Sequence, residues 1–220
     1  MLATPTVETA CSRLPTAGAA APSVARARQE AQSILKQEGL VREAWSFRVY
    51  EITAIRGELI ELGNKALRIP AHARLRGRMT SLAAAACTLG PGLEARISAL
   101  FQARQPLVAM ALDDLATGKL FLSSDRVYAR IRREARRLGL HTGDPQNPGD
   151  PGMALDEQRS VLGLSGMGAQ ISANAAGMLH PVKSLCFVVP LGAHLPAHGL
   201  SPRCARCASR DSCHLKVTPK

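Results

Sequence analysis

Residues 82–97 read LAAAACTLGPGLEARI, and the character of the chain changes in the middle of this stretch. The run from Leu82 to Cys87 is apolar and stops at a turn that contains Gly90, Pro91 and Gly92. A short apolar run bounded by Gly and Pro predicts a buried strand. We therefore expect a buried strand, a tight turn and a helix that begins near Gly92. The turn has two interpretations, an anion site at a helix N-terminus or a purely structural turn.

The residues on either side of this stretch predict further helices and strands. Upstream, a polar, Ala-rich segment predicts a helix that ends near Gly39, and an alternating segment predicts a strand from Trp45 to Ile55. Residues 51–62 form a hairpin candidate with its turn at Arg56 and Gly57. Downstream, the pattern predicts one long helix or two over 105–138, a loop over 142–152, a short helix over 155–164, and strands at 171–176 and 185–189. Strands at both ends and helices between them indicate an α+β fold with a mainly antiparallel sheet.

Composition and charge limit the class of protein. The chain has 220 residues, 46% of them apolar but only 3% aromatic, which suits one domain with an aliphatic core. The net charge of +11 favours an anionic partner, or reflects free use of Arg without a function. No apolar run of about 18 residues is present, and the start lacks the pattern of a signal peptide, so we expect a cytoplasmic protein that does not bind membranes. We expect a flexible tail (1–24), a folded domain (25–192) and a Cys-rich metal-binding tail (193–220).

Three segments, in order, resemble the activation (reactivation) domain of vitamin B12-dependent methionine synthase. The first is AACTLGPGLEARI at 85–97, which is followed by ALDDLATGK at 111–119. The second is NPGDPGMALDEQR at 147–159, and the third is MLHPVKSLCFVVP at 178–190. The order and spacing of the three segments carry the resemblance, which spans roughly residues 30–192.

The resemblance implies a helmet-shaped α+β fold whose mainly antiparallel sheet is flanked by helices. It also implies a function, because this family closes over a corrinoid and supports remethylation of its cobalt with S-adenosylmethionine. The expected partner is a cobalamin-binding protein or methyltransferase, which would supply the cobalamin. The positions that correspond to the family's ligand-binding segments are Asn147, Pro148, Gly149, Asp150, His180 and Lys183.

The sequence departs from the family at several of its characteristic positions. Pro145 stands where the family has an Arg, and Asp150 stands where it has a Tyr. The family's acidic residue and a further Tyr fall near Ala175 and Val189. Arg holds a carboxylate with two parallel hydrogen bonds, and Pro offers neither a charge nor a donor. The sequence therefore does not predict conventional binding of S-adenosylmethionine.

The C-terminus carries a candidate metal site, in the pattern C-x2-C-x5-C. A C-x-x-C turn directs two thiolates at one metal, and closed zinc sites and most iron–sulfur clusters have four protein ligands. His214 or His198 could complete a zinc site, and Cys186 could complete an iron–sulfur cluster. The alternative is a set of free thiols on a frayed tail. Reduction of a corrinoid requires a low-potential electron, which favours iron–sulfur slightly. The proposed ligands are Cys204, Cys207, Cys213 and His214.

Two other functions compete with the corrinoid hypothesis. A small nucleic-acid-binding protein would use a zinc knuckle and the basic helix segment 130–137. That segment is either a phosphate-binding face or a solvated helix end, and the scarcity of aromatic residues argues against stacking on bases. A degenerate family member with a scaffold role is the third hypothesis. The sequence identifies no catalytic residue, and it predicts that Cys87 and Cys186 are buried apolar residues.

Overall fold

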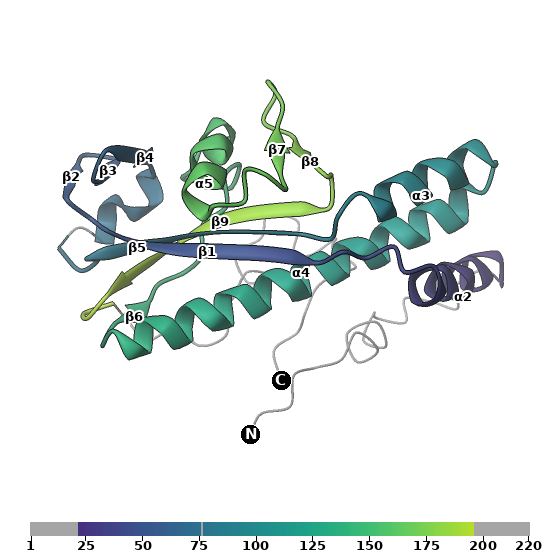
Figure 1. The fold of residues 1–220 in the computed structure, drawn as a ribbon, viewed down its shortest axis with the longest axis horizontal. Helices are drawn as coiled ribbons and strands as arrows, with labels where there is room; N and C mark the ends of the chain where they lie inside the picture. Colours follow the sequence, from purple (N-terminus) through teal and green to yellow (C-terminus); the bar gives the residue numbers. More distant parts are fainter. Residues whose placement is uncertain (1–21, 76, 196–220) are drawn as a thin grey trace.

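The computed structural model of the protein describes residues 22–75 and 77–195. A four-stranded sheet lies at the centre, and a long helix runs along one of its faces (Figure 1). All neighbouring strands of this sheet are antiparallel. The expected α+β fold with mainly antiparallel pairing is therefore confirmed. In order across the sheet, the strands are β1 (Ala44–Glu51), β5 (Ser81–Thr88), β9 (Ser184–Gly192) and β6 (His141–Thr142).

The two inner strands are buried on both faces, which explains their continuous apolar sequences. Alternate side chains of β5 enter separate cores, because successive side chains of a strand point to opposite faces. Ala83 and Ala85 belong to the core on the helical face, and Leu82 and Ala84 belong to the core on the other face. Phe187 of β9 is fully buried in the helical-face core. The alanines of β5 leave room for helices to approach the sheet closely.

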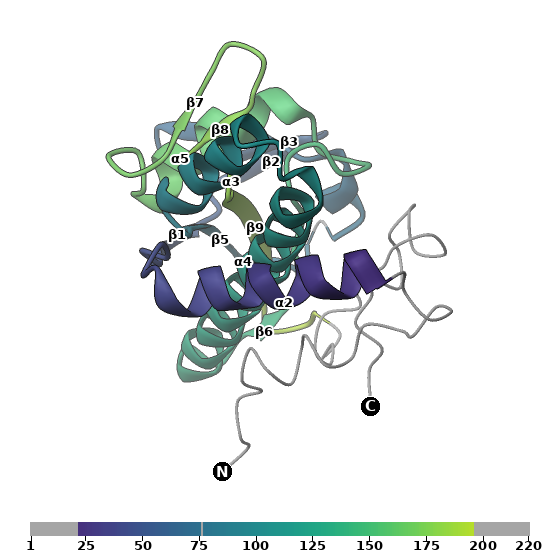
Figure 2. The same ribbon diagram turned by 90° about the vertical axis from the view of Figure 1, so that its right-hand side faces the viewer.

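One long helix, α4 (Pro106–Arg137), lies along one face of the sheet, and two further helices pack against it, as Figures 1 and 2 show. The longest has 32 residues and begins with a proline at its first position, where a missing N–H group is tolerated. It is continuous, which decides between the one or two helices expected over 105–138. The three helices are α2 (Pro22–Gln37), α3 (Gly92–Gln102) and α4 (Pro106–Arg137).

The opposite face of the sheet carries smaller elements around a second core, which includes Ile60, Leu67 and Leu164. The expected hairpin over 51–62 is present as two strands, and a third strand extends it. No helix in the described part of the chain is long and apolar enough to cross a bilayer. The elements on this face are β2 (Ala54–Arg56), β3 (Leu59–Leu62), β4 (Lys65–Arg68), η1 (Pro70–Leu75), η2 (Leu155–Glu157), α5 (Gln158–Ser165), β7 (Ser172–Ala173) and β8 (Leu179–His180).

Local bonding explains where the structure differs from the expected boundaries. The expected strand 171–176 is only two residues long in β7, because Asn174 Oδ1 accepts hydrogen bonds from the backbone N–H groups of Ala176 and Met178 and turns the chain. The strand, turn and helix predicted over 82–97 are confirmed. The turn is closely packed, because a β-carbon at Gly92 would lie 2.5 Å from the carbonyl oxygen of Leu40.

Candidate functional site

The loop that resembles the family's ligand-binding segment is fixed to the central sheet. Gln146 and Val188 exchange both backbone hydrogen bonds, each with an N···O distance of 2.9 Å. After this bridge, Asn147 donates to the carboxylate of Asp150 from its backbone and its side chain. Gly149 has a φ of +94°, a conformation that favours glycine. The segment 147–150 is therefore a compact turn that β9 positions.

Two side-chain oxygens beside this turn are buried without a hydrogen-bond partner in the described part of the chain. They are Asn147 Oδ1 and Gln158 Oε1. Gln158 opens α5, and its carbonyl oxygen lies 3.9 Å from the sulfur of Cys186 on β9. Buried polar atoms are nearly always hydrogen-bonded in folded proteins. Both oxygens can only accept, so each would be satisfied by an N–H or O–H group.

Lys183 occupies a different environment from the turn. Its side chain is only 10% exposed, and its Nζ lies 2.7 Å from Asp113 Oδ1 on α4. The same amine donates to Thr117 Oγ1 at 2.9 Å, one turn further along α4. His180 is exposed at the end of β8, directly before a cis peptide bond to Pro181. The ammonium group of Lys183 thus ties the start of β9 to α4, while His180 remains open to a partner.

The structure brings some of the predicted site residues together and separates others. A β-carbon at Gly149 would lie 3.3 Å from the side chain of Leu155, and one at Gly177 would lie 3.0 Å from it. The turn 147–150 and the β7–β8 hairpin therefore meet at Leu155. Lys183 directly precedes β9 and lies five residues before Val188, a separation of about 17 Å along a strand. Its amine belongs to the α4 contact and not to this turn.

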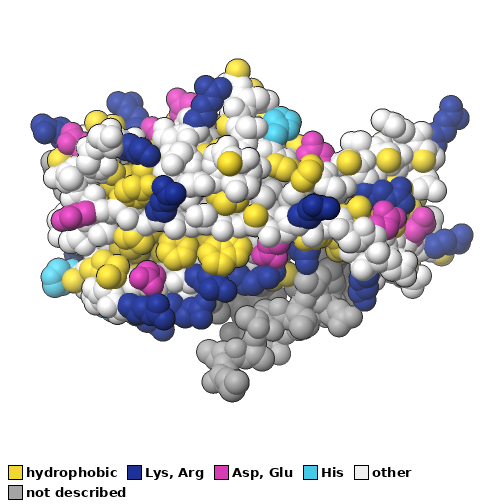
Figure 3. Space-filling view, viewed as in Figure 1, with side chains coloured by type: hydrophobic (Ala, Val, Ile, Leu, Met, Phe, Trp, Pro, Cys, Tyr) yellow, Lys and Arg dark blue, Asp and Glu magenta, His cyan; other side chains and the backbone are white. Residues whose placement is uncertain are grey.

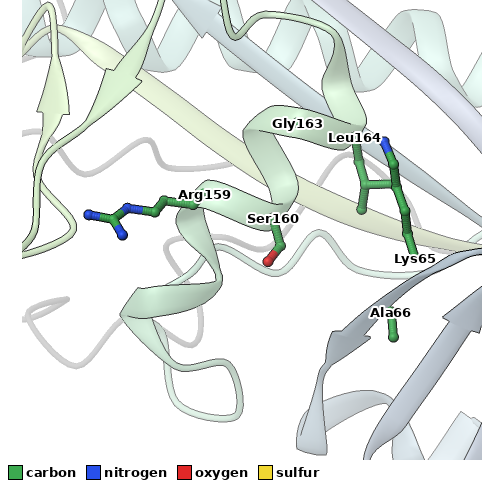
Figure 4. Close-up of a pocket in the computed structure, with 6 residues that line it drawn as sticks. All are labelled: Lys65, Ala66, Arg159, Ser160, Gly163 and Leu164. Atoms are coloured by element: carbon green, nitrogen blue, oxygen red, sulfur yellow. The ribbon is translucent and has the colours of Figure 1, made fainter.

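A pocket of about 300 Å³ lies between α5 and β4, and sequence reasoning missed it (Figure 4). Lys65 and Arg159 bring two cations to its walls, but Figure 4 shows that the Arg159 side chain points away from Lys65. Arg159 donates to the carbonyl oxygen of Asn174 at 2.9 Å. The two cations do not converge on one point, so the pocket has no ready-made clamp for an anion. In the sequence, the only indication of this pocket is Arg159, which directly follows the Leu-Asp-Glu-Gln segment.

The predicted metal ligands Cys204, Cys207, Cys213 and His214 lie outside the described residues. Within residues 22–75 and 77–195, no group of three or more His, Cys, Asp or Glu side chains could hold a metal ion. Cys87 and Cys186 are buried as expected. Burial raises the pKa of the Cys186 thiol to about 12, and the neighbouring Cys87 adds to the shift. The thiol is therefore neutral in this environment, whereas metals bind the thiolate.

No protein-family model matches the chain, and no curated protein matches it in sequence. A comparison of folds gives a clear result. A solved structure of the MetH reactivation domain bound to AdoHcy superposes with a TM-score of 0.61, over 89% of this chain and 79% of that chain. The chain has the fold of the MetH reactivation domain. The two sequences are 13% identical, so the similarity establishes the fold, and the resemblance inferred from the three sequence segments is confirmed at that level.

Around the turn 147–150, the described residues include no Arg that could hold a carboxylate in the conventional way. An S-adenosyl amino acid carries a carboxylate, which an Arg would bind with two hydrogen bonds. Pro145 occupies the position expected for that Arg, and the nearby Asp144 and Asp150 are acidic. The amine of Lys183 is already paired with Asp113. Of the ligand's groups, the turn is suited to hydrogen-bond donors and not to the carboxylate.

Proposed function

We propose that this chain is an accessory module that supports reactivation of a cobalamin-dependent methyltransferase. The observation that carries the proposal is the match of 89% of the chain to the MetH reactivation domain fold. The segments that carry the sequence resemblance support it, because the turn 147–150 and the β7–β8 hairpin of this chain meet at Leu155. The module would act by docking over the corrinoid of its partner.

Hydrogen-bond acceptors in and beside the turn 147–150 suit the amide N–H groups of a corrinoid better than the carboxylate of S-adenosylmethionine. A corrin ring carries primary amides around its edge, and their N–H groups can donate to carbonyl oxygens. Asn147 Oδ1 and Gln158 Oε1 are buried acceptors without partners among the described residues. His180 is exposed on the adjoining hairpin and would contact the same partner. Because the chain lacks the Arg, we expect S-adenosylmethionine to bind with a Kd above about 100 µM, or weaker than about −5.5 kcal/mol.

Isothermal titration of the full chain with a cob(II)alamin-loaded methyltransferase tests the proposal. We expect a complex of one to one, and we expect Asn147→Leu to weaken it at least about tenfold, because the change removes an acceptor and fills its space. Asn64→Leu is the matched control, since Asn64 is exposed in the turn between β3 and β4. Absence of a complex, or equal affinity for the two variants, would count against this site.

We also propose that the C-terminal cluster of Cys204, Cys207, Cys213 and His214 binds zinc or an iron–sulfur cluster. Support comes from the C-x2-C-x5-C spacing, which is typical of metal sites. An iron–sulfur cluster would supply electrons to the corrinoid, whereas zinc would have a structural role in the tail 193–220. An anaerobic absorption spectrum with metal analysis distinguishes them. A broad band at about 400 nm together with iron indicates an iron–sulfur cluster, and a colourless protein with one zinc indicates a structural zinc site. A metal-free protein refutes both.

A further inference from the structure

Strand β1 is an edge of the central sheet, and one row of its backbone groups faces away from the sheet. Among the described strands, β1 pairs only with β5, and the N–H group of Ile52 donates to the carbonyl oxygen of Thr80 at the end of their ladder. Hydrogen-bonded and non-hydrogen-bonded pairs alternate in an antiparallel ladder. Continuing this alternation from Ile52, every second residue of β1 bonds to β5. The residues between them direct their N–H and C=O groups to the open edge: Trp45, Phe47, Val49 and Glu51.

In the described part of the chain, this edge lacks several of the features that normally protect a sheet edge. Within residues 22–75 and 77–195, no other segment forms hydrogen bonds to the outward backbone groups of those four residues. β1 is eight residues long, contains no Pro, and pairs with β5 without a bulge. An exposed edge of this kind is a template for pairing with another chain. Proteins use such edges to bind extended peptides as an added strand.

The side chains along the open edge form an apolar surface on the α4 side. Trp45 and Phe47 stack with ring centroids 6.5 Å apart, and Trp45 is 39% exposed. Phe47 and Val49 pack at the margin of the helical-face core. Figure 3 shows a band of hydrophobic side chains here, with Lys and Arg side chains directly below it. An added strand would therefore bury apolar surface as well as satisfy backbone groups.

A row of arginines on α4 borders this apolar band. At 100° per residue, these side chains fall within about 60° of one another on the helix. Arg130 lies over the Trp45 ring at 4.7 Å from its centroid, which joins the row to β1. Arg126 pairs with Glu43 and Arg137 with Glu134, while no ion pair to a described residue is found for the other two. The row consists of Arg126, Arg130, Arg133 and Arg137.

We propose that the open edge of β1 binds an extended, acidic segment of a partner protein as an added strand. The edge provides the backbone pairing, Trp45 and Phe47 provide apolar contact, and the arginine row selects negative charge. This interaction is independent of the corrinoid function proposed above. It uses β1 and α4, whereas the turn 147–150 and the β7–β8 hairpin lie with the elements of the opposite face.

Charge argues against a second copy of this chain as the occupant. Two copies paired through β1 about a twofold axis would form one continuous sheet. Their α4 helices would lie on the same face of that sheet, and the arginine rows would approach each other. Backbone pairing also argues against nucleic acid, since only a peptide matches the alternating donors and acceptors of a strand edge. Arg130 further covers one face of the Trp45 ring, the surface that a base would need for stacking.

The sole tryptophan of the chain is Trp45, so its fluorescence in the full-length protein reports on this edge directly. The probe is a blocked octapeptide Val-Thr-Glu-Thr-Val-Thr-Glu-Thr, called the Glu–Val peptide, whose Val and Glu side chains lie on the same face of an added strand. The controls are the Lys–Val peptide, which reverses the charge, and a Glu–Val peptide that is N-methylated at alternate residues, which cannot pair along one edge. We expect only the first peptide to shift the Trp45 emission, with an affinity that falls as salt rises.

Variants on α4 test the arginine row by fluorescence anisotropy of the labelled Glu–Val peptide. Arg130→Gln and Arg133→Gln should each raise its Kd about two- to fivefold, the range for an exposed ion pair. Arg136→Gln is the control, because Arg136 is on the same helix but about 90° away from the row, and its Kd should not change. Binding of the Lys–Val or N-methylated peptide with equal affinity overturns the proposal. A thymidine oligonucleotide that binds this edge while the Glu–Val peptide does not, or a dimer that buries Trp45, also overturns it.

Discussion

The contact between Lys183 and Asp113 allows a quantitative prediction, because the two partners differ in exposure. The Lys183 side chain is 10% exposed, whereas that of Asp113 is 48% exposed. Asp113→Ala leaves a buried ammonium with Thr117 as its remaining partner, and hydrogen bonds to charged groups contribute about 1.5–3 kcal/mol. Lys183→Met retains the aliphatic contacts and leaves a carboxylate that water can reach. We therefore expect Asp113→Ala to lower the free energy of unfolding by about 2–3 kcal/mol, and Lys183→Met by only about 1 kcal/mol.

Thermal and urea unfolding of the two variants and their double variant measure this asymmetry. For a domain of this size, the larger loss corresponds to a Tm lower by about 4–12 °C. The double variant should be less destabilised than the sum of the single losses, because the two side chains interact directly. The exposed pair Arg137 and Glu134 is the matched control, and its coupling should stay below about 0.5 kcal/mol. An unchanged Tm in Asp113→Ala, with partner binding lost in Lys183→Met, would refute the structural role and make Lys183 a ligand-binding residue.

Three further predictions follow from packing, burial and the tail. Gly192→Ala should lower the free energy of unfolding, measured in urea, by about 1–3 kcal/mol, since its β-carbon would overlap the backbone carbonyl oxygen of Arg78. Gly163→Ala, whose β-carbon would meet nothing within 4 Å, should raise it by about 0.5–1 kcal/mol, and a reversed order would contradict the packing. Because burial raises its pKa to about 12, the thiol of Cys186 should resist alkylation by iodoacetamide at pH 8.5 until the protein unfolds. Mass spectrometry that detects rapid alkylation of Cys186 in the folded protein would contradict this prediction. Replacing Cys204 and Cys207 by Ser should make the tail protease-sensitive and leave the main thermal transition unchanged; loss of the whole transition would make the cluster part of the core.

Local patterns predicted the elements whose bonding is local. The apolar run before Gly90 and Pro91 identified β5, its turn and α3, because the strand, the turn residues and the helix are adjacent in sequence. The hairpin of β2 and β3 was predicted for the same reason. The sequence left open whether residues 105–138 form one helix or two. Continuity of α4 depends on residues such as Leu112 and Ile131, which pack in one core along the length of the helix.

Long-range contacts decide the features that sequence reasoning could not supply. The partner of Lys183 is Asp113, on a helix separated from β9 in sequence by the β7–β8 region and α5. The two-residue strand β6 exists only because β9 lies beside it. The open edge of β1 depends on strand order, which the alternation of Trp45 and its neighbours does not reveal. Of the site, the sequence located the turn 147–150 but gave no indication of the unpaired acceptors within and beside it.

In the proposed function, this chain docks over the corrinoid of a methyltransferase. The most direct measurement is the anaerobic absorption spectrum of protein-bound cob(II)alamin as the full chain is added. The proposal predicts a spectral change that saturates at one equivalent and is weakened by Asn147→Leu, because docking alters the surroundings of the corrin ring. An unchanged spectrum, together with separate elution of the two proteins in gel filtration, would contradict the proposed function and leave only the fold in common with the MetH reactivation domain.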